Sequence, residues 1–448
     1  MDVRGKTMVV VGLARTGMAL VRFLSSRGAE VIAADRREEA ELGEAAAAVR
    51  GAGARLVTGP HRERDFDAAD MIVLSPGVPE TIPAVAAARL SGVPVVGEIE
   101  LASWFLAAPL AAISGTNGKT TTTTLVGEML RVAGLNTYVG GNIGTPLIDC
   151  VRDDADYDAV VAEISSFQLD TTETFAPKVA ALLNVAEDHM DRYPDMAAYA
   201  ASKARLFENQ EPDDVAVLNG ADAWCRDMVP SIRSRKWFFA GRRDGEQGAD
   251  VGPDRIVLHV PGHEGEVLDL SRFRLAGAHN RENASAAALV AVAMGAGTDA
   301  VQRSLDSFGG LDHRLQLVRT VEGVRYYNDS KATNVDAVVR ALEDFNDPLV
   351  LIMGGRDKGA DFSVLAGPVK EKVRCLVVTG EARHTIRRAL GHTVETRDAP
   401  ELDEAVEVAA KVAKPGWVVL FSPACASFDR FTDYAHRGRV FAGAVEAL

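Results

Sequence analysis

Short apolar runs alternate with amphipathic stretches from the start of the chain. The apolar run Thr7–Val11 is followed by a glycine turn, a helical stretch Thr16–Arg27 and a second apolar run, Glu30–Ala34. Two more apolar runs follow, Met71–Leu74 and Val93–Val96. This alternation predicts a βαβ arrangement with a parallel sheet, in which ligands bind at the carboxyl ends of the strands.

The same alternation begins again near residue 110. We predict strands at Leu110–Ile113, Ala159–Ala162 and Val179–Leu183, and helices from about Thr120 to Ala133, Met196 to Glu208 and Asn280 to Met294. The stretch from Gly241 to Gly265 is charged and contains a short alternating run, Arg255–Val260. That run indicates an antiparallel addition in this block, and the pattern does not say with which strand it pairs.

A third block follows Gly309-Gly310, a pair that indicates a linker. Its strands are predicted near Gly323–Tyr327, Leu349–Met353, Arg374–Val378 and Trp417–Phe421. The chain is therefore predicted to be an α/β protein of three domains, with limits at 1–97, 98–309 and 310–448. Its 448 residues agree with that division.

Composition and charge restrict the partners. The chain has 49 lysines and arginines against 63 aspartates and glutamates, so its net charge is −14, which disfavours nucleic acid and requires a local site for any phosphate. We expect no membrane span and no signal peptide, and hence a cytoplasmic protein, because no apolar run is long enough. The four cysteines lie far apart, which argues against a zinc site or disulfides.

The strongest chemical signal is the segment Ser114–Thr121, which reads SGTNGKTT between a predicted strand and a predicted helix. Glycines let backbone N–H groups approach phosphate oxygens, Lys119 adds a positive charge, and Thr120 can offer its hydroxyl group to Mg²⁺. Ile113 stands where the general phosphate-loop pattern has its first glycine. The alternative is a strand–helix turn that contains Gly-Lys-Thr by chance.

The first turn, Gly12–Gly17, partly matches a dinucleotide-binding pattern, with Asp35 at the end of the second strand. Ala14 replaces a glycine that would let the backbone approach a pyrophosphate. A nicotinamide cofactor is therefore disfavoured, although another nucleotide could fit. A purely structural βα turn explains this segment equally well.

Two further segments place polar residues after strands of the second block. Glu163 ends a strand beside the phosphate loop and suits Mg²⁺, and Asp188 with His189 follows the next strand. A lone histidine is more often structural, but this position favours a metal or substrate role.

Other residues carry weaker signals. Lys203 lies in a predicted helix, where a lysine is usually solvated. Asn280 and Asn283 share a helix face and could contact a base, yet a helix cap plus one exposed polar residue is the better interpretation of the residues alone.

Three loops of the last block combine charged residues with glycine or small residues. They are residues 329–334, 354–358 and 422–427, and each follows a predicted strand. Their convergence at one sheet edge indicates a site for an anionic small molecule.

Eight segments, in this order, resemble the Mur ligases of bacterial cell-wall synthesis. They are GTNGKTT (115–121), GNIGTPL (141–147), EISSFQL (163–169), NVAEDHMDRY (184–193), HNRENA (279–284), LDHR (311–314), NDSKATN (328–334) and SPACASFDRF (422–431). The last two favour the members that add D-glutamate. The resemblance implies a Rossmann-like N-terminal domain, a P-loop ATPase-like central domain and a Rossmann-like C-terminal domain.

The resemblance also implies roles for single residues at an ATP site. The phosphates would be held by Gly115, Thr116, Asn117, Gly118, Lys119, Thr120 and Thr121. Asn280, Asn283, Arg314 and Asp329 would contact the nucleotide, the last two through domain closure. Two Mg²⁺ ions would be bound by Thr120, Glu163, His189 and Lys203, with Lys203 carrying CO₂ as a carbamate. Catalytic roles would fall to Lys119, Glu163, His189, Lys203 and Arg314.

The implied substrates are UDP-N-acetylmuramoyl-L-alanine and D-glutamate. Asp35, Arg36 and Ser75 in the first domain would hold the UDP end, and Asn142 in the second would contact the muramoyl part. The D-glutamate pocket in the third domain would be formed by Lys331, Thr333, Lys358, Ser427 and Tyr434. Two positions depart from the family pattern: Arg356 stands where an acidic residue is frequent, and Tyr434 where phenylalanine is.

The expected reaction is amide formation through an acyl phosphate made with ATP, by a monomeric enzyme that binds neither nucleic acid nor membrane. Three alternatives remain at this point. The chain could be a sibling ligase for another amino acid or for folate, a nicotinamide oxidoreductase built on the first domain, or a nucleotide-gated binding protein without catalysis.

Overall fold

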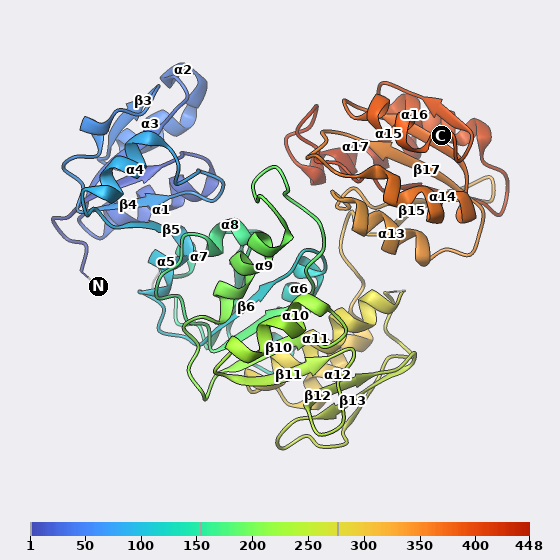
Figure 1. Cartoon of the computed structure of the whole chain (residues 1–448), viewed down its shortest axis with the longest axis horizontal. Helices are drawn as coiled ribbons and strands as arrows, with labels where there is room; N and C mark the ends of the chain where they lie inside the picture. The colour runs from blue at the N-terminus through green and yellow to red at the C-terminus, as the bar shows by residue number, and fades with distance from the viewer. Residues whose placement is uncertain (1, 153–154, 276) are drawn as a thin grey trace. The chain divides into compact units, whose positions relative to one another are not determined.

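The computed structural model describes residues 2–152, 155–275 and 277–448, and in these residues the strands form three sheets (Figure 1). The first sheet has the order β3-β2-β1-β4-β5 and is parallel throughout. Its strands are β1 (Thr7–Val11), β2 (Glu30–Asp35), β3 (Arg55–Thr58), β4 (Met71–Leu74) and β5 (Val95–Gly97). The predicted parallel βαβ arrangement is confirmed.

Helices cover the first sheet because its central strands are apolar on both faces. They are α1 (Arg15–Ser26), α2 (Glu39–Leu42), α3 (Glu44–Gly51), the 3₁₀ turn η1 (Glu63–Asp65), α4 (Pro83–Leu90) and α5 (Glu98–Ser103). One core cluster joins β1, β2 and β4 to α4 and to Phe66, which is fully buried.

The second sheet has the order β14-β13-β12-β11-β10-β9-β6-β8-β7. Its strands are β6 (Leu110–Ser114), β7 (Thr137–Gly141), β8 (Ala159–Glu163), β9 (Val179–Leu182), β10 (Val215–Asn219), β11 (Arg235–Phe239), β12 (Gln247–Val251), β13 (Arg255–His259) and β14 (Val267–Asp269). β13 pairs antiparallel with both β12 and β14, so the predicted antiparallel addition is confirmed.

The helices of this block connect and cover the strands. They are α6 (Lys119–Val132), α7 (Leu147–Cys150), α8 (Ser166–Leu169), α9 (Met196–Ala204), η2 (Arg205–Phe207), α10 (Ala223–Met228), η3 (Val229–Ser231), α11 (Ala278–Ala293) and α12 (Thr298–Ser307). β6 lies between β8 and β9, and α6 starts at its carboxyl end. The carboxyl ends of β6, β8 and β9 therefore lie side by side at one edge of the sheet.

The third sheet has the order β15-β16-β20-β17-β18-β19 and is parallel except for the β15–β16 pair. Its strands are β15 (Gln316–Val321), β16 (Val324–Asn328), β17 (Leu349–Gly354), β18 (Val373–Thr379), β19 (Thr396–Asp398) and β20 (Val418–Phe421). The helices are α13 (Val335–Glu343), η4 (Phe362–Leu365), α14 (Ala366–Lys372), α15 (Arg383–Leu390), α16 (Leu402–Val412) and α17 (Tyr434–Glu446).

Strand β17 shows how this sheet is buried between two helical layers (Figure 1). Leu349, Leu351 and Met353 pack with residues of α13, α14 and α15. Val350 and Ile352 point to the other face and pack with residues of α16 and α17. Because successive side chains of a strand alternate between the two faces, one continuous apolar run serves both cores.

By their contacts the residues divide into two compact units. The first unit contains Met1–Val185, Tyr199–Arg272 and Glu282–Ser307, and the second contains Ala186–Ala198, Phe273–Arg281 and Phe308–Leu448. The sequence pattern had placed the segments Ala186–Ala198 and Phe273–Arg281 in the central domain. In the structure these two segments pack with the C-terminal block instead.

Among the helices in the described part of the chain, we find none that is both long and apolar enough to cross a membrane.

Candidate functional site

The phosphate loop lies between the carboxyl end of β6 and the start of α6, as the sequence predicts. Lys119 Nζ donates hydrogen bonds of 2.8 Å to the carbonyl oxygens of Gly115 and Thr116, so its ammonium group lies over the loop backbone. Gly118 has φ +85°, and a Cβ atom there would come within 2.3 Å of Asn283 Oδ1. A glycine is therefore required where the loop meets α11.

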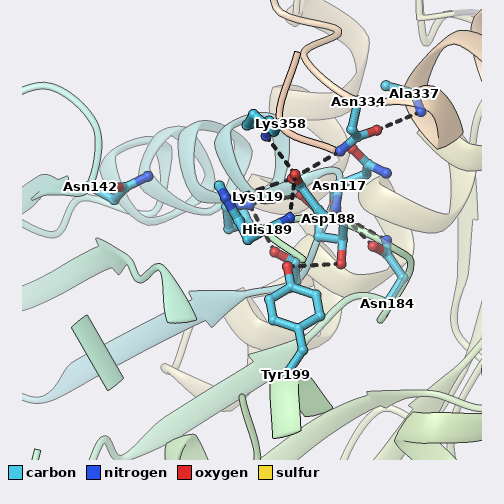
Figure 2. Close-up of polar contacts among 12 residues, drawn as sticks. Asn117, Lys119, Asn142, Asn184, Asp188, His189, Tyr199, Asn334, Ala337 and Lys358 are labelled. Atoms are coloured by element: carbon cyan, nitrogen blue, oxygen red, sulfur yellow. Dashed lines mark hydrogen bonds and ion pairs between the residues drawn. The ribbon is translucent and has the colours of Figure 1, made fainter. Parts of the chain in front are cut away.

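Asn184, which follows β9, holds this loop in shape (Figure 2). Its side chain accepts a hydrogen bond from the Asn117 N–H group at 2.8 Å and donates one to the Asn117 carbonyl oxygen at 3.1 Å. The Thr116 N–H group donates to the Asn184 carbonyl oxygen at 3.0 Å. The motif NVAEDHMDRY contained Asn184, but only the fold shows that its amide anchors the loop.

Buried hydroxyl groups lie at both ends of the loop. Ser114 Oγ and Thr121 Oγ1 are buried and have no hydrogen-bond partner among the described residues. Together with the N-terminus of α6 and the Lys119 ammonium group, these polar groups suit the phosphates of a nucleotide.

A row of three side chains crosses from α6 to the loop after β7. Thr120 Oγ1 donates to Glu163 Oε2 at 2.7 Å, and Asn142 Nδ2 donates to Glu163 Oε1 at 2.8 Å. Glu163 is only 2% exposed. A hydroxyl group and a carboxylate beside a phosphate loop fit Mg²⁺, which is commonly bound by one or two carboxylates and by substrate phosphates. Among the described residues, no group of three histidine, cysteine or acidic side chains forms a complete metal cage.

Lys203 is buried, 1% exposed, so the expectation of a solvated helical lysine is wrong. Its Nζ atom lies 4.6 Å from the centroid of the Tyr199 ring, and the Tyr199 hydroxyl group lies 3.2 Å from Thr116 Oγ1. α9 is held in place by Arg205, whose Nε donates to the Leu169 carbonyl oxygen at 2.8 Å. The helix thus presents its buried face, with Lys203, toward the phosphate-loop side of its unit.

Asn280 and Asn283 are both buried, at 3% and 5% exposure. α11 begins at Ala278, before either asparagine. The interpretation as a helix cap plus one exposed polar residue is therefore wrong. Asn283 lies against Gly118 in the first unit, at the phosphate loop.

In the second unit, Asp188 collects several donors (Figure 2). Lys358 Nζ lies 2.5 Å from Asp188 Oδ1, Asn334 Nδ2 donates to Oδ2 at 3.2 Å, and His189 Nε2 lies 3.6 Å from Oδ2. Burial alone would raise the pKa of Asp188, but the positive charge of Lys358 and these hydrogen bonds hold it below its usual value. Thr333 and Lys358 line a cavity of about 260 Å³ with Asp188 and His189.

Arg314 and Asp329 lie near each other in the same unit, as the resemblance implies for a pair at the nucleotide. Asp329 is fully buried and accepts hydrogen bonds from Ser422 Oγ at 2.8 Å and from the Leu315 N–H group at 3.3 Å. Burial raises the pKa of Asp329 to about 7, although Ser422 and the charge of Arg314 act in the opposite direction.

The three polar loops of the last block do converge. The Arg356 N–H and carbonyl groups pair with Ala426, at 2.8 and 2.9 Å, which joins loop 354–358 to loop 422–427. The fully buried Arg437 donates to the carbonyl oxygens of Cys425, Ala426 and Ser330. Loop 329–334 is thereby bound to the same assembly. Lys331, Lys358 and the buried Ser427 lie on these joined loops.

In the first sheet, Asp35 ends β2 and accepts a hydrogen bond from the Leu13 N–H group at 2.7 Å. Burial alone would raise the pKa of Asp35, but hydrogen bonds from Arg37 and Leu13 lower it to about 2. The arginine that pairs with Asp35 is Arg37, whereas Arg36 is exposed. Ser75 Oγ donates to the Gly12 carbonyl oxygen at 2.7 Å, so Ser75 and the first turn lie together.

The chain has three α/β blocks, with a phosphate loop in the middle block and joined polar loops in the last. These features define a class, the multidomain α/β proteins with a phosphate-loop site. The chain belongs to the Mur ligase family. Residues 6–97 match the MurD-like N-terminal domain of Mur ligases, residues 113–291 the Mur ligase middle domain, and residues 313–425 the glutamate ligase domain of Mur ligases.

Relatives and solved structures agree with this assignment. The chain is 52% identical over 448 residues to the UDP-N-acetylmuramoylalanine–D-glutamate ligase of Desulfatibacillum aliphaticivorans, covering 100% of both chains. It is 47% identical over 448 residues to the ligase of the same name from Geobacter metallireducens, covering 100% of this chain and 99% of that one. The fold is similar to UDP-N-acetylmuramate-alanine ligase MurC from Thermotoga maritima, with a TM-score of 0.60, 19% identity and 99% of each chain covered. The predicted family and fold class are confirmed.

Proposed function

We propose that this chain is an ATP-dependent amide ligase that adds D-glutamate to UDP-N-acetylmuramoyl-L-alanine. The observation that carries the proposal is the row Thr120–Glu163–Asn142, in which both outer side chains donate to the buried carboxylate. It connects the phosphate loop to the residue expected to contact the muramoyl substrate. ATP, the phosphoryl donor, and the carboxylate of the muramoyl substrate, the phosphoryl acceptor, would meet at this row. The full-length relatives named as D-glutamate ligases support the choice of substrates.

The reaction has two steps. A carboxylate oxygen of the L-alanyl group attacks the γ-phosphorus of ATP, which forms an acyl phosphate and releases ADP. The amine of D-glutamate then attacks the acyl carbon, the C–O bond to phosphate breaks, and the amine loses a proton. The products are the amide, ADP and phosphate.

Residues of the phosphate loop would hold and orient ATP in this reaction. The Lys119 ammonium group, positioned over the loop backbone, balances negative charge on the transferring phosphoryl group. Asn280, Asn283, Arg314 and Asp329 would orient the rest of the nucleotide.

Thr120, Glu163, His189 and Lys203 would bind two Mg²⁺ ions. When bound, Mg²⁺ neutralises charge on the phosphate oxygens and aligns them for displacement. Lys203 is buried beside the Tyr199 ring, and we infer that its amine reacts with CO₂ to form a carbamate. The carbamate would convert a cation into an anionic oxygen ligand.

We assign the UDP end of the substrate to Asp35, Arg36 and Ser75 in a UDP-binding domain, residues 1–97. The central domain, residues 98–309, would bind ATP, and residues 310–448 would bind the amino acid through Lys331, Thr333, Lys358, Ser427 and Tyr434. We further propose that the enzyme is a monomer that works in the cytoplasm on small molecules and binds no nucleic acid.

The deciding experiment measures phosphate release from ATP with UDP-N-acetylmuramoyl-L-alanine present. D-glutamate, L-glutamate and diaminopimelate are added in turn, and the product is identified by mass spectrometry. We expect release that requires D-glutamate and a product heavier by one glutamyl residue. Phosphate release with another amino acid instead would support a ligase activity with a different amino-acid substrate. No release with any of the three amino acids would contradict the proposal.

A further inference from the structure

The hydroxyl group of Tyr434 contacts the ammonium group of Lys331. Lys331 Nζ lies 3.1 Å from Tyr434 Oη and 4.4 Å from the centroid of its ring. An ammonium group can only donate hydrogen bonds, so the phenol oxygen accepts. Tyr434 therefore contacts Lys331 in two ways, through a hydrogen bond and through a cation–π interaction.

Backbone contacts fix the distance between these two residues. Tyr434 is the first residue of α17, which is capped by Asp433. The Tyr434 carbonyl oxygen accepts a hydrogen bond of 2.8 Å from Ser330 Oγ, directly before Lys331. The Lys331 N–H group in turn donates to the His313 carbonyl oxygen at 3.1 Å. Both side chains thus start from backbone positions that hydrogen bonds hold in place.

We propose that the hydroxyl group of Tyr434 positions the ammonium group of Lys331 for a carboxylate of the amino-acid substrate. This rests on the proposed function, which places both residues in the D-glutamate pocket. A lysine side chain loses much conformational freedom when its ammonium group binds an anion. The phenol oxygen holds Nζ before the substrate arrives, so less freedom is lost on binding.

Replacement of the tyrosine by phenylalanine isolates this effect. A phenylalanine ring keeps the cation–π interaction and the packing but removes the hydrogen bond. Tyr434 would act on substrate affinity through Lys331, as a positioning residue.

The first test detects the contact without any enzymatic activity. The full-length chain and its Tyr434→Phe variant are treated with an amine-acylating reagent at fixed pH, and modification of Lys331 is followed by peptide mass spectrometry. We expect Lys331 to react at least about threefold faster in the variant than in the parent chain. The reason is that an ammonium group held by a hydrogen bond is less available as the free amine. Tyr326→Phe, which removes a hydroxyl group from the core of the same sheet, should leave the rate unchanged. An equal rate in Tyr434→Phe and the parent would overturn the proposal.

The second test is a double-mutant cycle on KM for D-glutamate. Tyr434→Phe should raise this KM about tenfold, the loss expected for one hydrogen bond to a charged group, and should change KM for ATP much less. In the Lys331→Met background, Tyr434→Phe should change KM for D-glutamate less than twofold, because the effect of Tyr434 passes through Lys331. Equal effects in both backgrounds would mean that the phenol binds the substrate directly, and the proposal would be wrong.

The two tests separate failure of this inference from failure of the proposed function. If the parent chain requires a different amino acid, the proposed substrate is wrong, and the cycle is run with that amino acid. If the parent chain forms no amide at all, the proposed function fails, while the acylation rates still decide whether the hydroxyl group holds Lys331.

Discussion

Three of the charged residues expected at the site are buried. Glu163, Lys203 and Asp329 are each at most 5% exposed, although charged side chains are rarely buried without a function or a partner. Each lies within a unit that also holds other residues implied by the family resemblance. Burial is consistent with a role for these three residues but does not single them out, because structural groups such as Glu98 and Arg437 are equally buried.

Lys119→Ala should reduce turnover at least about 100-fold, because the positive charge over the phosphate loop is lost from the transition state. The unfolding temperature should change little, since Lys119 is half-buried and packs on loop backbone. Phosphate release and calorimetry of the purified variant check both points. Lys411→Ala, which removes an exposed lysine, serves as the control. Normal turnover in Lys119→Ala would contradict the phosphate-loop assignment.

Lys203 should carry about 44 Da of labile CO₂, the mass added by carbamate formation at a lysine. With ¹³C-bicarbonate, NMR of the protein should show a carbamate signal that is absent from Lys203→Ala. The control is Lys178→Ala, which removes an exposed lysine paired with Asp214 and should keep the signal. Lys203→Ala should also lose activity. If that variant stays fully active, with no response to bicarbonate, the carbamate assignment is wrong.

Sequence reasoning found the residues of the phosphate loop because glycine, lysine and threonine at fixed spacing have a local chemical meaning. It failed at Lys203, Asn280 and Asn283, where the outcome depends on burial by distant segments. Only the family resemblance gave these three residues an expected role at the site. For Arg36, the structure places the neighbouring Arg37 on Asp35, and no local pattern distinguishes the two arginines.

At the scale of elements, the joined loops of the third block depend on close backbone approach. Gly355 has φ +138°, and a Cβ atom there would come within 2.4 Å of the Ala426 carbonyl oxygen. This approach permits the pairing of Arg356 with Ala426. The Arg356 side chain itself is exposed and pairs with Glu381, so its departure from the family pattern does not alter the loop junction.

Gly355→Ala should push loop 422–427 away from loop 354–358 and raise KM for D-glutamate about tenfold or more, through displacement of Ser427 and Lys358. Gly359→Ala is the matched control, because Gly359 also has a positive φ of +81° but its Cβ would meet nothing within 4 Å. Steady-state kinetics with each substrate varied distinguish the variants. Similar KM values for D-glutamate in both would show that the close approach does not shape the pocket.

The apolar pattern predicted most of the buried strands but not β10, which is buried along its whole length, and it missed most edge strands. β1, β4, β6, β8 and β17 are continuous apolar runs and were found within one or two residues. β3, β7, β14, β15 and β19 lie at sheet edges, and none of them formed an apolar run that stood out from its surroundings. An edge strand is covered on fewer sides, so its sequence is under a weaker apolar constraint.

For the whole molecule, pH should act on stability through Glu98, the first residue of α5. Glu98 is 2% exposed and accepts a hydrogen bond from the Ile148 N–H group at 2.7 Å. Burial raises the pKa of Glu98 from 4.5 to about 7, despite hydrogen bonds that act against the shift. Between these two pH values the folded state holds a proton that the unfolded state has lost.

Stability should therefore fall as pH rises from about 5 to 7.5, by at most roughly 3 kcal/mol from this group. Glu98→Gln should remove the part of the dependence that Glu98 contributes, because a neutral amide oxygen still accepts the Ile148 hydrogen bond. The part from Asp329, whose pKa burial also raises to about 7, should remain. Urea unfolding at pH 5 and pH 8 measures the difference. Glu371→Gln, at an exposed position, should keep the parent's dependence. A parent-like pH response in Glu98→Gln would exclude Glu98 as its source.

The division of the chain into two units could not be predicted from its local patterns. Asp188 belongs to the C-terminal unit, where it pairs with Lys358, 170 residues further along the chain. Such a pairing leaves no mark on the hydrophobic periodicity near either residue. Boundaries that are predicted from apolar runs therefore separate the three sheets correctly, but they do not show to which unit the connecting loops belong.

This pairing also has a consequence for the order of synthesis. At roughly 5–20 residues per second, a ribosome needs about 10–30 seconds to pass from Asp188 to Lys358. During that interval the segment Ala186–Ala198 has been made, but the partner of its buried carboxylate does not yet exist. A nascent chain stopped between β14, which ends at Asp269, and Lys358 would carry every strand of the first two sheets and still lack this charge pair. Completion of the cluster around Asp188 is thus one of the late events in making the molecule.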